Sequence, residues 1–222
     1  MYQHKWISEA TMNLPVGKAV CVGRNYVAHA KELNNPVPSR PLLFMKPASA
    51  LCEFGPDIFI HSKRGAHHYE AELVLLVGST IHCDSTEPLR HIAGVGLGLD
   101  LTLRELQAQL KQKGHPWEVA KAFDGSGCIT PFIPVTQEQL HAGLTYRFWQ
   151  NGTLRQQGNS EHMIFNLEML LKAITQFFTL HPGDIVMTGT PEGVGPLNVG
   201  DQLKLQLGES ATVFHSKVVK QV

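Results

Sequence analysis

Short apolar runs rich in valine, isoleucine and leucine recur along this chain, and each is bounded by glycine, proline or aspartate. Runs of this length, closed by turn-forming residues, are typical of β-strands. They cover residues 58–60, 72–77, 92–99, 185–188, 203–207 and 212–219. A chain of 222 residues with this pattern is expected to fold as a β-rich α+β protein with a few short helices.

The segment from residue 102 to residue 113 predicts a helix, because leucines recur on one face at helical spacing. Thr102 and Glu105 have the spacing of a capping box at its start, and Gly114 is placed to end it. The same kind of pattern predicts two further helices, over residues 26–33 and 167–178.

The charges of the chain balance, with 19 basic and 19 acidic side chains. Binding to nucleic acid or to an anionic membrane through bulk charge is therefore not expected. No apolar run approaches the roughly 18 residues that a membrane span needs, and the first ten residues lack the apolar core of a signal peptide.

No segment rich in serine, proline or charge divides the chain. Residues 1–20 are therefore expected to form a short lead-in, and residues 21–222 a single domain. The four cysteines are widely spaced and include no C-x-x-C pair, which indicates buried thiols in a reducing cytoplasm.

Three acidic side chains are candidates for a metal site. Glu70 and Glu72 point to the same face if their segment is a strand, and Asp100 ends the apolar run that precedes it. Three carboxylates without cysteine suit a hard ion such as Mg²⁺ or Mn²⁺. The alternative is a solvated strand face, with Asp100 capping the helix that follows.

His29 and Glu32 are candidates for acid–base work, since residues three apart on a helix meet on one surface. A carboxylate beside an imidazole raises its basicity and fixes its orientation. The alternative is an ordinary surface pair. Lys121 lies in a weakly polar stretch, where it would bind an anion or extend along the surface to solvent.

A glycine-rich loop over residues 187–195 follows an apolar run and can offer backbone N–H groups and threonine hydroxyls to an anion. The sequence contains no G-x-G-x-x-G or G-x-x-x-x-G-K-[ST] nucleotide motif, and residue 124 is aspartate where a G-x-S-x-G elbow around Ser126 needs glycine. Serine hydrolase chemistry is therefore disfavoured.

In their order along nearly the whole chain, these motifs resemble the fumarylacetoacetate hydrolase family. The short lead-in resembles the compact acylpyruvase branch, without the amino-terminal domain of the larger fumarylacetoacetases. The motifs are GRNY (23–26), FMKP (44–47), EAE (70–72), DLTLRELQ (100–107), KAFD (121–124) and TGTPEGVG (188–195).

The resemblance implies mixed β-sheets rolled around the active site, and a homodimer. It implies that Mg²⁺ or Mn²⁺ is held by Glu70, Glu72 and Asp100. His29 and Glu32 would activate water, and Lys121 would stabilise an oxyanion. Contacts to a small anionic keto-acid substrate would come from Arg24, Tyr26, Lys46, Gln107 and Thr190.

The implied activity is hydrolysis of the C–C bond of acylpyruvates, with the divalent ion stabilising the pyruvate enolate that leaves. The same chemistry would serve an oxaloacetate decarboxylase, an oxaloacetate keto–enol tautomerase, or the isomerase or decarboxylase of homoprotocatechuate breakdown. A metal-stabilised binding protein without turnover is disfavoured, because His29, Glu32 and Lys121 accompany the proposed ligands.

Overall fold

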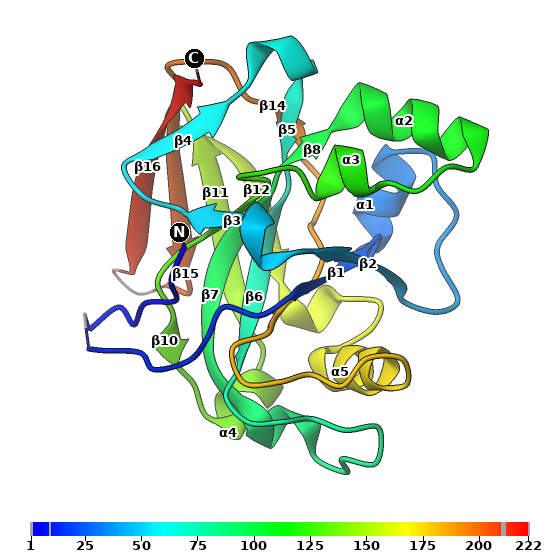
Figure 1. Cartoon of the computed structure of the whole chain (residues 1–222), viewed down its shortest axis with the longest axis vertical. Coiled ribbons are helices and arrows are strands. Elements are labelled where there is room, and N and C mark those ends of the chain that lie inside the picture. Colours follow the sequence, from blue (N-terminus) through cyan, green and yellow to red (C-terminus); the bar gives the residue numbers. More distant parts are fainter. Residues whose placement is uncertain (1, 9, 210–211, 222) are drawn as a thin grey trace.

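The computed structural model describes residues 2–8, 10–209 and 212–221, and within them the strands form three sheets (Figure 1). The 8-stranded sheet has the order β2-β1-β13-β6-β7-β9-β3, with β10 pairing with β7. Its strands are β1 (Ala19–Gly23), β2 (Leu42–Lys46), β3 (Leu51–Glu53), β6 (Ala71–Val77), β7 (Ile92–Asp100), β9 (Gly127–Ile129), β10 (Ile133–Pro134) and β13 (Ile185–Met187).

The other two sheets are smaller. The 5-stranded sheet has the order β12-β11-β15-β16-β4, and the 3-stranded sheet the order β14-β5-β8. Their strands are β4 (Asp57–Ile60), β11 (Thr145–Gln150), β12 (Thr153–Asn159), β15 (Gln202–Leu207), β16 (Val213–Lys220), β5 (His67–Tyr69), β8 (Thr102–Leu103) and β14 (Gly195–Pro196).

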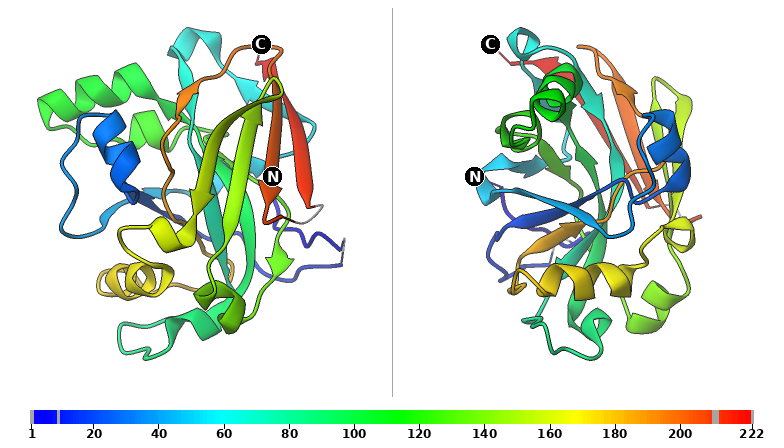
Figure 2. Two further views of the ribbon diagram at one scale, coloured as in Figure 1. Left: turned by 180° about the vertical axis from the view of Figure 1, so that it is seen from behind. Right: turned by 90° about the vertical axis from the view of Figure 1, so that its right-hand side faces the viewer.

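The predicted β-rich fold with mixed sheets is confirmed. Strand β1 is parallel to β13, whereas β6 is antiparallel to both of its neighbours, β13 and β7. The six apolar runs correspond to β4, β6, β7, β13, β15 and β16, each within one residue of its predicted bounds. Figure 2 shows the 5-stranded sheet as a separate layer beside the longer strands of the 8-stranded sheet.

Both faces of strand β6 are buried, which explains why its sequence is apolar without alternation. Leu73 and Leu75 belong to the main core, together with residues of the 5-stranded sheet such as Phe148. Val74 and Leu76 lie in a second cluster, on which the lead-in packs its own apolar side chains, among them Trp6. Burying each such leucine contributes roughly 1.5–3 kcal/mol.

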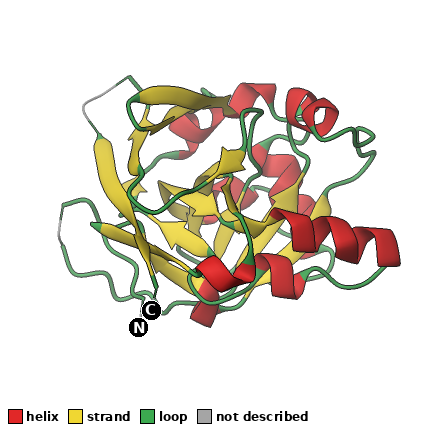
Figure 3. Cartoon of the chain, turned by 90° about the horizontal axis from the view of Figure 1, so that it is seen from above, coloured by secondary structure: helices red, strands yellow, loops and turns green. Residues whose placement is uncertain are grey.

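The helices lie mainly on the side of the molecule away from the 5-stranded sheet (Figures 1 and 3). They are α1 (Val27–Glu32), α2 (Arg104–Lys113), α3 (Glu118–Lys121), α4 (Gln137–His141) and α5 (Leu167–Thr175). Short 3₁₀ turns cover Ala48–Ala50, Ser62–Arg64, Pro88–His91 and Ser160–His162.

The predicted helix over residues 102–113 is present, but the prediction of a capping box at its start is wrong. Thr102 belongs to strand β8, and its hydroxyl donates to the backbone carbonyl of Asp100 at 3.2 Å. Helix α2 therefore begins only at Arg104, with Leu103 before it and no side-chain cap. Gly114 ends the helix in the left-handed conformation at φ 66°, as predicted.

Two further expectations are wrong, one about helix α5 and one about the cysteines. Helix α5 ends at Thr175, three residues before the predicted end, and Phe177 within the predicted range is 71% exposed. Cys83 is exposed, so the thiols are not all buried. Among the described residues, no helix has the length and apolar character that crossing a membrane requires.

Candidate active site

Two central strands bring the three predicted metal ligands together. Glu70 lies between β5 and β6, Glu72 is the second residue of β6, and Asp100 is the last residue of β7. Because β6 and β7 are antiparallel neighbours, the end of one strand meets the start of the other, and the Asp100 amide donates to the Glu70 carbonyl at 2.9 Å. The three carboxylates are buried and offer oxygens that lie within 4.8 Å of one another.

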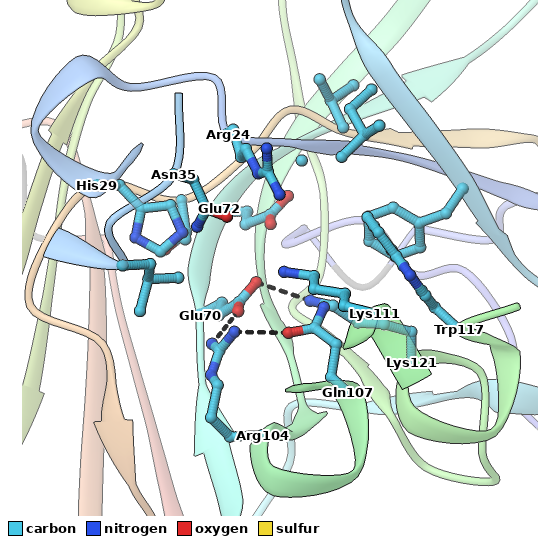
Figure 4. A pocket seen from close by; sticks show the side chains of 16 residues that line it. Arg24, His29, Asn35, Glu70, Glu72, Arg104, Gln107, Lys111, Trp117 and Lys121 are labelled. Carbon is cyan, nitrogen blue, oxygen red and sulfur yellow. Dashed lines mark hydrogen bonds and ion pairs between the residues drawn. The ribbon is translucent and has the colours of Figure 1, made fainter. Parts of the chain in front are cut away.

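Cationic side chains contact two of these carboxylates. The Lys121 ammonium lies between them, 2.8 Å from Glu70 Oε2 and 2.6 Å from Asp100 Oδ2. Arg104 forms an ion pair with the other oxygen of Glu70, and Lys46 Nζ lies 2.8 Å from Asp100 Oδ1. The dashed lines in Figure 4 show the contacts of Glu70 with Arg104 and Lys121.

Glu72 is different, because among the described residues its carboxylate has one hydrogen bond, from the Gly189 amide at 2.8 Å. Burial, and after it the charges of Asp100 and Glu70, raise the pKa of Glu72 well above its ordinary value. For Glu70, burial alone would raise the pKa, but Lys121 and Arg104 outweigh it and hold the pKa well below the usual range. Without a further cation, the cluster therefore disfavours a charge on Glu72.

The residues present fit a hard divalent cation. Three carboxylate oxygens, buried and close enough to share one ion, are the donor set that Mg²⁺ and Mn²⁺ prefer. A cation among them would also remove the repulsion that raises the pKa of Glu72. Glu70, Glu72 and Asp100 are the residues that would hold it.

His29 and Glu32 lie on one face of α1, as their spacing predicts. His29 Nδ1 is 3.2 Å from Glu32 Oε2, and the second oxygen of Glu32 accepts a hydrogen bond from the Gly193 amide at 3.0 Å. The His29 ring is buried and lines the same pocket as Glu70 and Glu72. Figure 4 shows His29 on one side of this pocket and the α2 and α3 side chains on the other.

Three of the five predicted substrate contacts line this pocket, namely Arg24, Gln107 and Thr190. Arg24 lies on the turn after β1 at φ 59°, and burial lowers its pKa from the ordinary value. Gln107 accepts a hydrogen bond from Arg104 at 2.8 Å. These residues come from three different segments, so only the folded chain brings them to one place.

The structure places the other two predicted contacts, Tyr26 and Lys46, outside the pocket lining. The Tyr26 hydroxyl donates to the backbone carbonyl of Asn159 at 3.2 Å and lies 3.4 Å from the Tyr146 hydroxyl. Lys46 is fully buried beside Asp100, where its ammonium also donates to Ser126 Oγ at 3.0 Å. Lys46 therefore contacts a candidate metal ligand and does not face the cavity.

The glycine-rich loop directs its polar groups toward the protein itself. The Thr188 and Thr190 hydroxyls donate to backbone carbonyls of Leu73 and Ala71 on β6, each at 2.9 Å. Its backbone binds two carboxylates of the protein, that of Glu72 through the Gly189 amide and that of Glu32 through the Gly193 amide. Gly189 has φ 99°, and a Cβ there would lie 2.8 Å from Asn25 Cβ. The loop thus orients the carboxylate of a candidate metal ligand, which its sequence alone did not reveal.

Three further residues line the pocket although no role was predicted for them from the sequence: Arg104, Lys111 and Trp117. Arg104, Gln107 and Lys111 are spaced by three and four residues, which places them on one face of a helix. This periodicity was visible in the sequence. Which face of α2 meets the pocket was not, because it depends on how the helix packs against distant segments such as the one that carries Glu70.

Known proteins resemble this chain both in sequence and in fold. The family model described as "Fumarylacetoacetate (FAA) hydrolase C-terminal" matches residues 18–219. Oxaloacetate tautomerase YcgM of Escherichia coli K12 is 45% identical over 215 residues, which are 96% of this chain and 98% of that protein. The mitochondrial oxaloacetate tautomerase FAHD1 of Arabidopsis thaliana is 42% identical over 188 residues, 84% of each chain.

Among solved structures, a fumarylpyruvate hydrolase from Pseudomonas aeruginosa, in complex with Mn²⁺ and pyruvate, superposes with a TM-score of 0.88. It is 33% identical, and the match covers 97% of this chain and 95% of that one. The family model spans most of the chain, and the relatives agree with it in sequence and in fold. The chain therefore belongs to the fumarylacetoacetate hydrolase family.

Proposed function

We propose that this protein is an oxaloacetate keto–enol tautomerase that depends on Mg²⁺ or Mn²⁺. The observation that carries the proposal is that the hydrogen-bonded His29–Glu32 pair lines the same pocket as the buried carboxylate cluster. The names of the relatives from E. coli and A. thaliana support the choice of oxaloacetate. Acylpyruvate hydrolysis, which the sequence favoured, becomes the second candidate.

His29 is the group that moves the proton. When Nδ1 donates its hydrogen to Glu32 Oε2, Nε2 keeps its lone pair and accepts a proton from C3 of the substrate. The electron pair of the broken C3–H bond moves into the C2–C3 bond, and the electron pair of the C2–O π bond moves to oxygen. The His29 imidazolium then returns the proton to that oxygen. One proton leaves and one is added, so no water is consumed.

Glu32 fixes the orientation of the imidazole and stabilises its charged form. It can do so because the Gly193 amide holds its second oxygen. Glu32 is therefore a positioning residue that acts through His29.

The cationic side chains bind the anionic substrate. Burial alone would lower the pKa of Lys121, but Asp100 and Glu70 outweigh burial and raise the pKa, so its ammonium stays charged. Lys121 and Arg24 both line the pocket and attract the carboxylate and the developing charge on the keto oxygen. A divalent cation bound by Glu70, Glu72 and Asp100 would supply a Lewis acid for the 2-oxo acid oxygens.

Acylpyruvate hydrolysis remains the second candidate because the same dyad would activate a water molecule. The structural likeness to a fumarylpyruvate hydrolase supports it. In that reaction His29 would accept a proton from water, and Lys121 would stabilise the oxyanion formed at the distal carbonyl. The homodimer and the cytoplasmic location stay predictions.

Two assays on the same preparation test the proposal. Ketonisation of freshly dissolved enol-oxaloacetate is followed by ultraviolet absorbance with Mg²⁺, with Mn²⁺, and with EDTA as the control. Acetylpyruvate is incubated in parallel, and pyruvate and acetate are measured. Metal-dependent ketonisation, faster than any acetylpyruvate cleavage, is expected. Cleavage of acetylpyruvate without ketonisation would replace the tautomerase by the hydrolase.

A further inference from the structure

Two lysines of the pocket each lie against an aromatic ring. Lys121 Nζ is 5.0 Å from the centroid of Phe44, and Lys111 Nζ is 5.0 Å from that of Trp117. The two rings are neighbours, with centroids 6.4 Å apart. Trp117 thus holds the Lys111 side chain at the pocket, as Phe44 holds that of Lys121.

The two ammonium groups differ in what they contact. Lys121 is buried and lies within ion-pair distance of Glu70 and Asp100. Lys111 is half-buried, and within the described ranges of the chain it has no ion-pair partner and no side-chain hydrogen bond. Its positive charge is therefore available to a ligand.

The position of Lys111 along α2 fixes where that charge lies. Arg104 pairs with Glu70 and donates to Gln107, so the first turn of the helix faces the carboxylate cluster. Lys111 is one turn beyond Gln107 on the same face, near the end of the helix, and it lines the same pocket. Lys111 is therefore one of the cationic side chains that a substrate anchored at the carboxylates meets in this pocket (Figure 4).

We propose that Lys111 binds the distal carboxylate of a dicarboxylic 2-oxo acid and so selects dicarboxylates over 2-oxo acids that end in an alkyl group. The inference rests on the proposed function, which places the 2-oxo acid end of the substrate at Glu70, Glu72 and Asp100. Lys111 is a residue that determines specificity, and it takes no part in the proton transfer.

The electrostatics of the pocket agree with this role. Burial, and after it the charges of Arg24, Arg104 and Lys121, lower the pKa of Lys111 to about 8. The negative charge of a carboxylate bound beside the ammonium offsets both effects. An anion is attracted more strongly by the half-buried ammonium of Lys111 than by the fully hydrated ammonium of a surface lysine, because the effective dielectric constant is lower in the pocket.

Binding calorimetry tests the proposal without depending on turnover. The Mg²⁺-loaded protein is titrated with oxaloacetate at tautomeric equilibrium and with 2-oxobutyrate, in which a methyl group replaces the distal carboxylate. The variants are Lys111→Met, which removes the charge and keeps the length of the side chain, and Lys111→Arg, which keeps the charge. Lys113→Met is the matched control, because Lys113 is exposed on the same helix and does not line the pocket.

Lys111→Met is expected to raise the dissociation constant of oxaloacetate about tenfold and to leave that of 2-oxobutyrate within about twofold. Lys111→Arg and Lys113→Met are expected to bind both ligands as the parent does. An equal loss for both ligands in Lys111→Met, or no loss for either, overturns the proposal. A protein that shows the ligand-selective loss but fails to ketonise oxaloacetate would overturn the tautomerase and leave the role of Lys111 standing.

Discussion

The floor and the rim of the pocket are built in different ways. We define the floor as Glu70, Glu72 and Asp100, which are buried and belong to the paired central strands β6 and β7 or adjoin them. The rim is formed by α1, α2 and the residues that face the pocket from them. On the rim, the Glu32 side chain is 31% exposed and Lys111 is half-buried.

This difference separates two tasks. The strands hold the backbone of the floor by pairing on both sides. The rim side chains lie on two short helices that belong to none of the sheets. Under the proposed function, the floor binds the cation and the rim decides which proton moves and which substrate is bound.

The largest effect is expected from Glu72→Gln in the floor. The neutral amide removes one of three anionic donors, so metal-dependent activity should fall at least about a thousandfold, the loss of several kcal/mol of electrostatic stabilisation. Mn²⁺ binding, followed by electron paramagnetic resonance, should weaken in parallel while circular dichroism stays unchanged. Glu105→Gln, which neutralises an exposed acid on α2, is the control. Unchanged Mn²⁺ affinity in Glu72→Gln would remove Glu72 from the metal site.

In the rim, Glu32→Gln should lower kcat for ketonisation about a hundredfold, because the imidazole loses the carboxylate that orients it and stabilises its charged form. Mn²⁺ affinity should be retained, in contrast to the floor variant. The measurement is kcat with saturating metal, and its pH profile should change with it. A loss confined to KM would show that Glu32 serves substrate binding and does not act through His29.

A pair of glycine substitutions compares the stability of the two regions. A Cβ at Gly98 on β7 would lie 3.0 Å from Val74 Cγ2 and 3.0 Å from Ile129 Cδ1, so Gly98→Ala should destabilise the protein by about 2 kcal/mol. Gly114 has φ 66° and open space around its Cβ position, so Gly114→Ala should cost about 1 kcal/mol through backbone strain alone. Urea unfolding measures both, and a larger cost at Gly114 would contradict the comparison.

The smallest effect concerns pH. Lys111 faces Arg24, Arg104, Lys121 and Glu70, and its pKa is lowered to about 8. Its charged form predominates below that value and is lost above it, so the dissociation constant of oxaloacetate should rise a few-fold between about pH 7 and pH 9. Calorimetry at several pH values measures this, and Lys111→Met should show a flatter profile. The same pH dependence in that variant would assign the titration to another group.

Six strands and the floor were predictable because both follow from local pattern. Apolar runs closed by turn residues marked six of the sixteen described strands to within one residue, and the spacing of Glu70 and Glu72 placed two carboxylates together. Asp100 was a candidate because it ended such a run. The resemblance to the family supplied the roles of these residues, which pattern alone left open.

What could not be predicted depends on contacts between distant segments. Lys46 occurs in a recognisable motif, but pairing of β2 with β1 directs it into the interior beside Asp100. Thr102 had the spacing of a capping residue, yet its hydroxyl bonds to the carbonyl of Asp100 and its backbone pairs with β5. Lys111 acquires its place in the pocket because the face of α2 that carries Arg104 and Gln107 packs toward the carboxylate cluster.

The hydrogen bond from the Gly189 amide to Glu72 determines which substitutions in the loop can remove the donor. The donor is a backbone N–H group, so replacing one side chain by another does not remove it. Proline is the exception, because it has no backbone N–H. Glycine is required at this position by its φ of 99° and by the closeness of Asn25. Replacing the exposed side chain of a loop residue such as Glu192 therefore leaves the donor to the carboxylate in place.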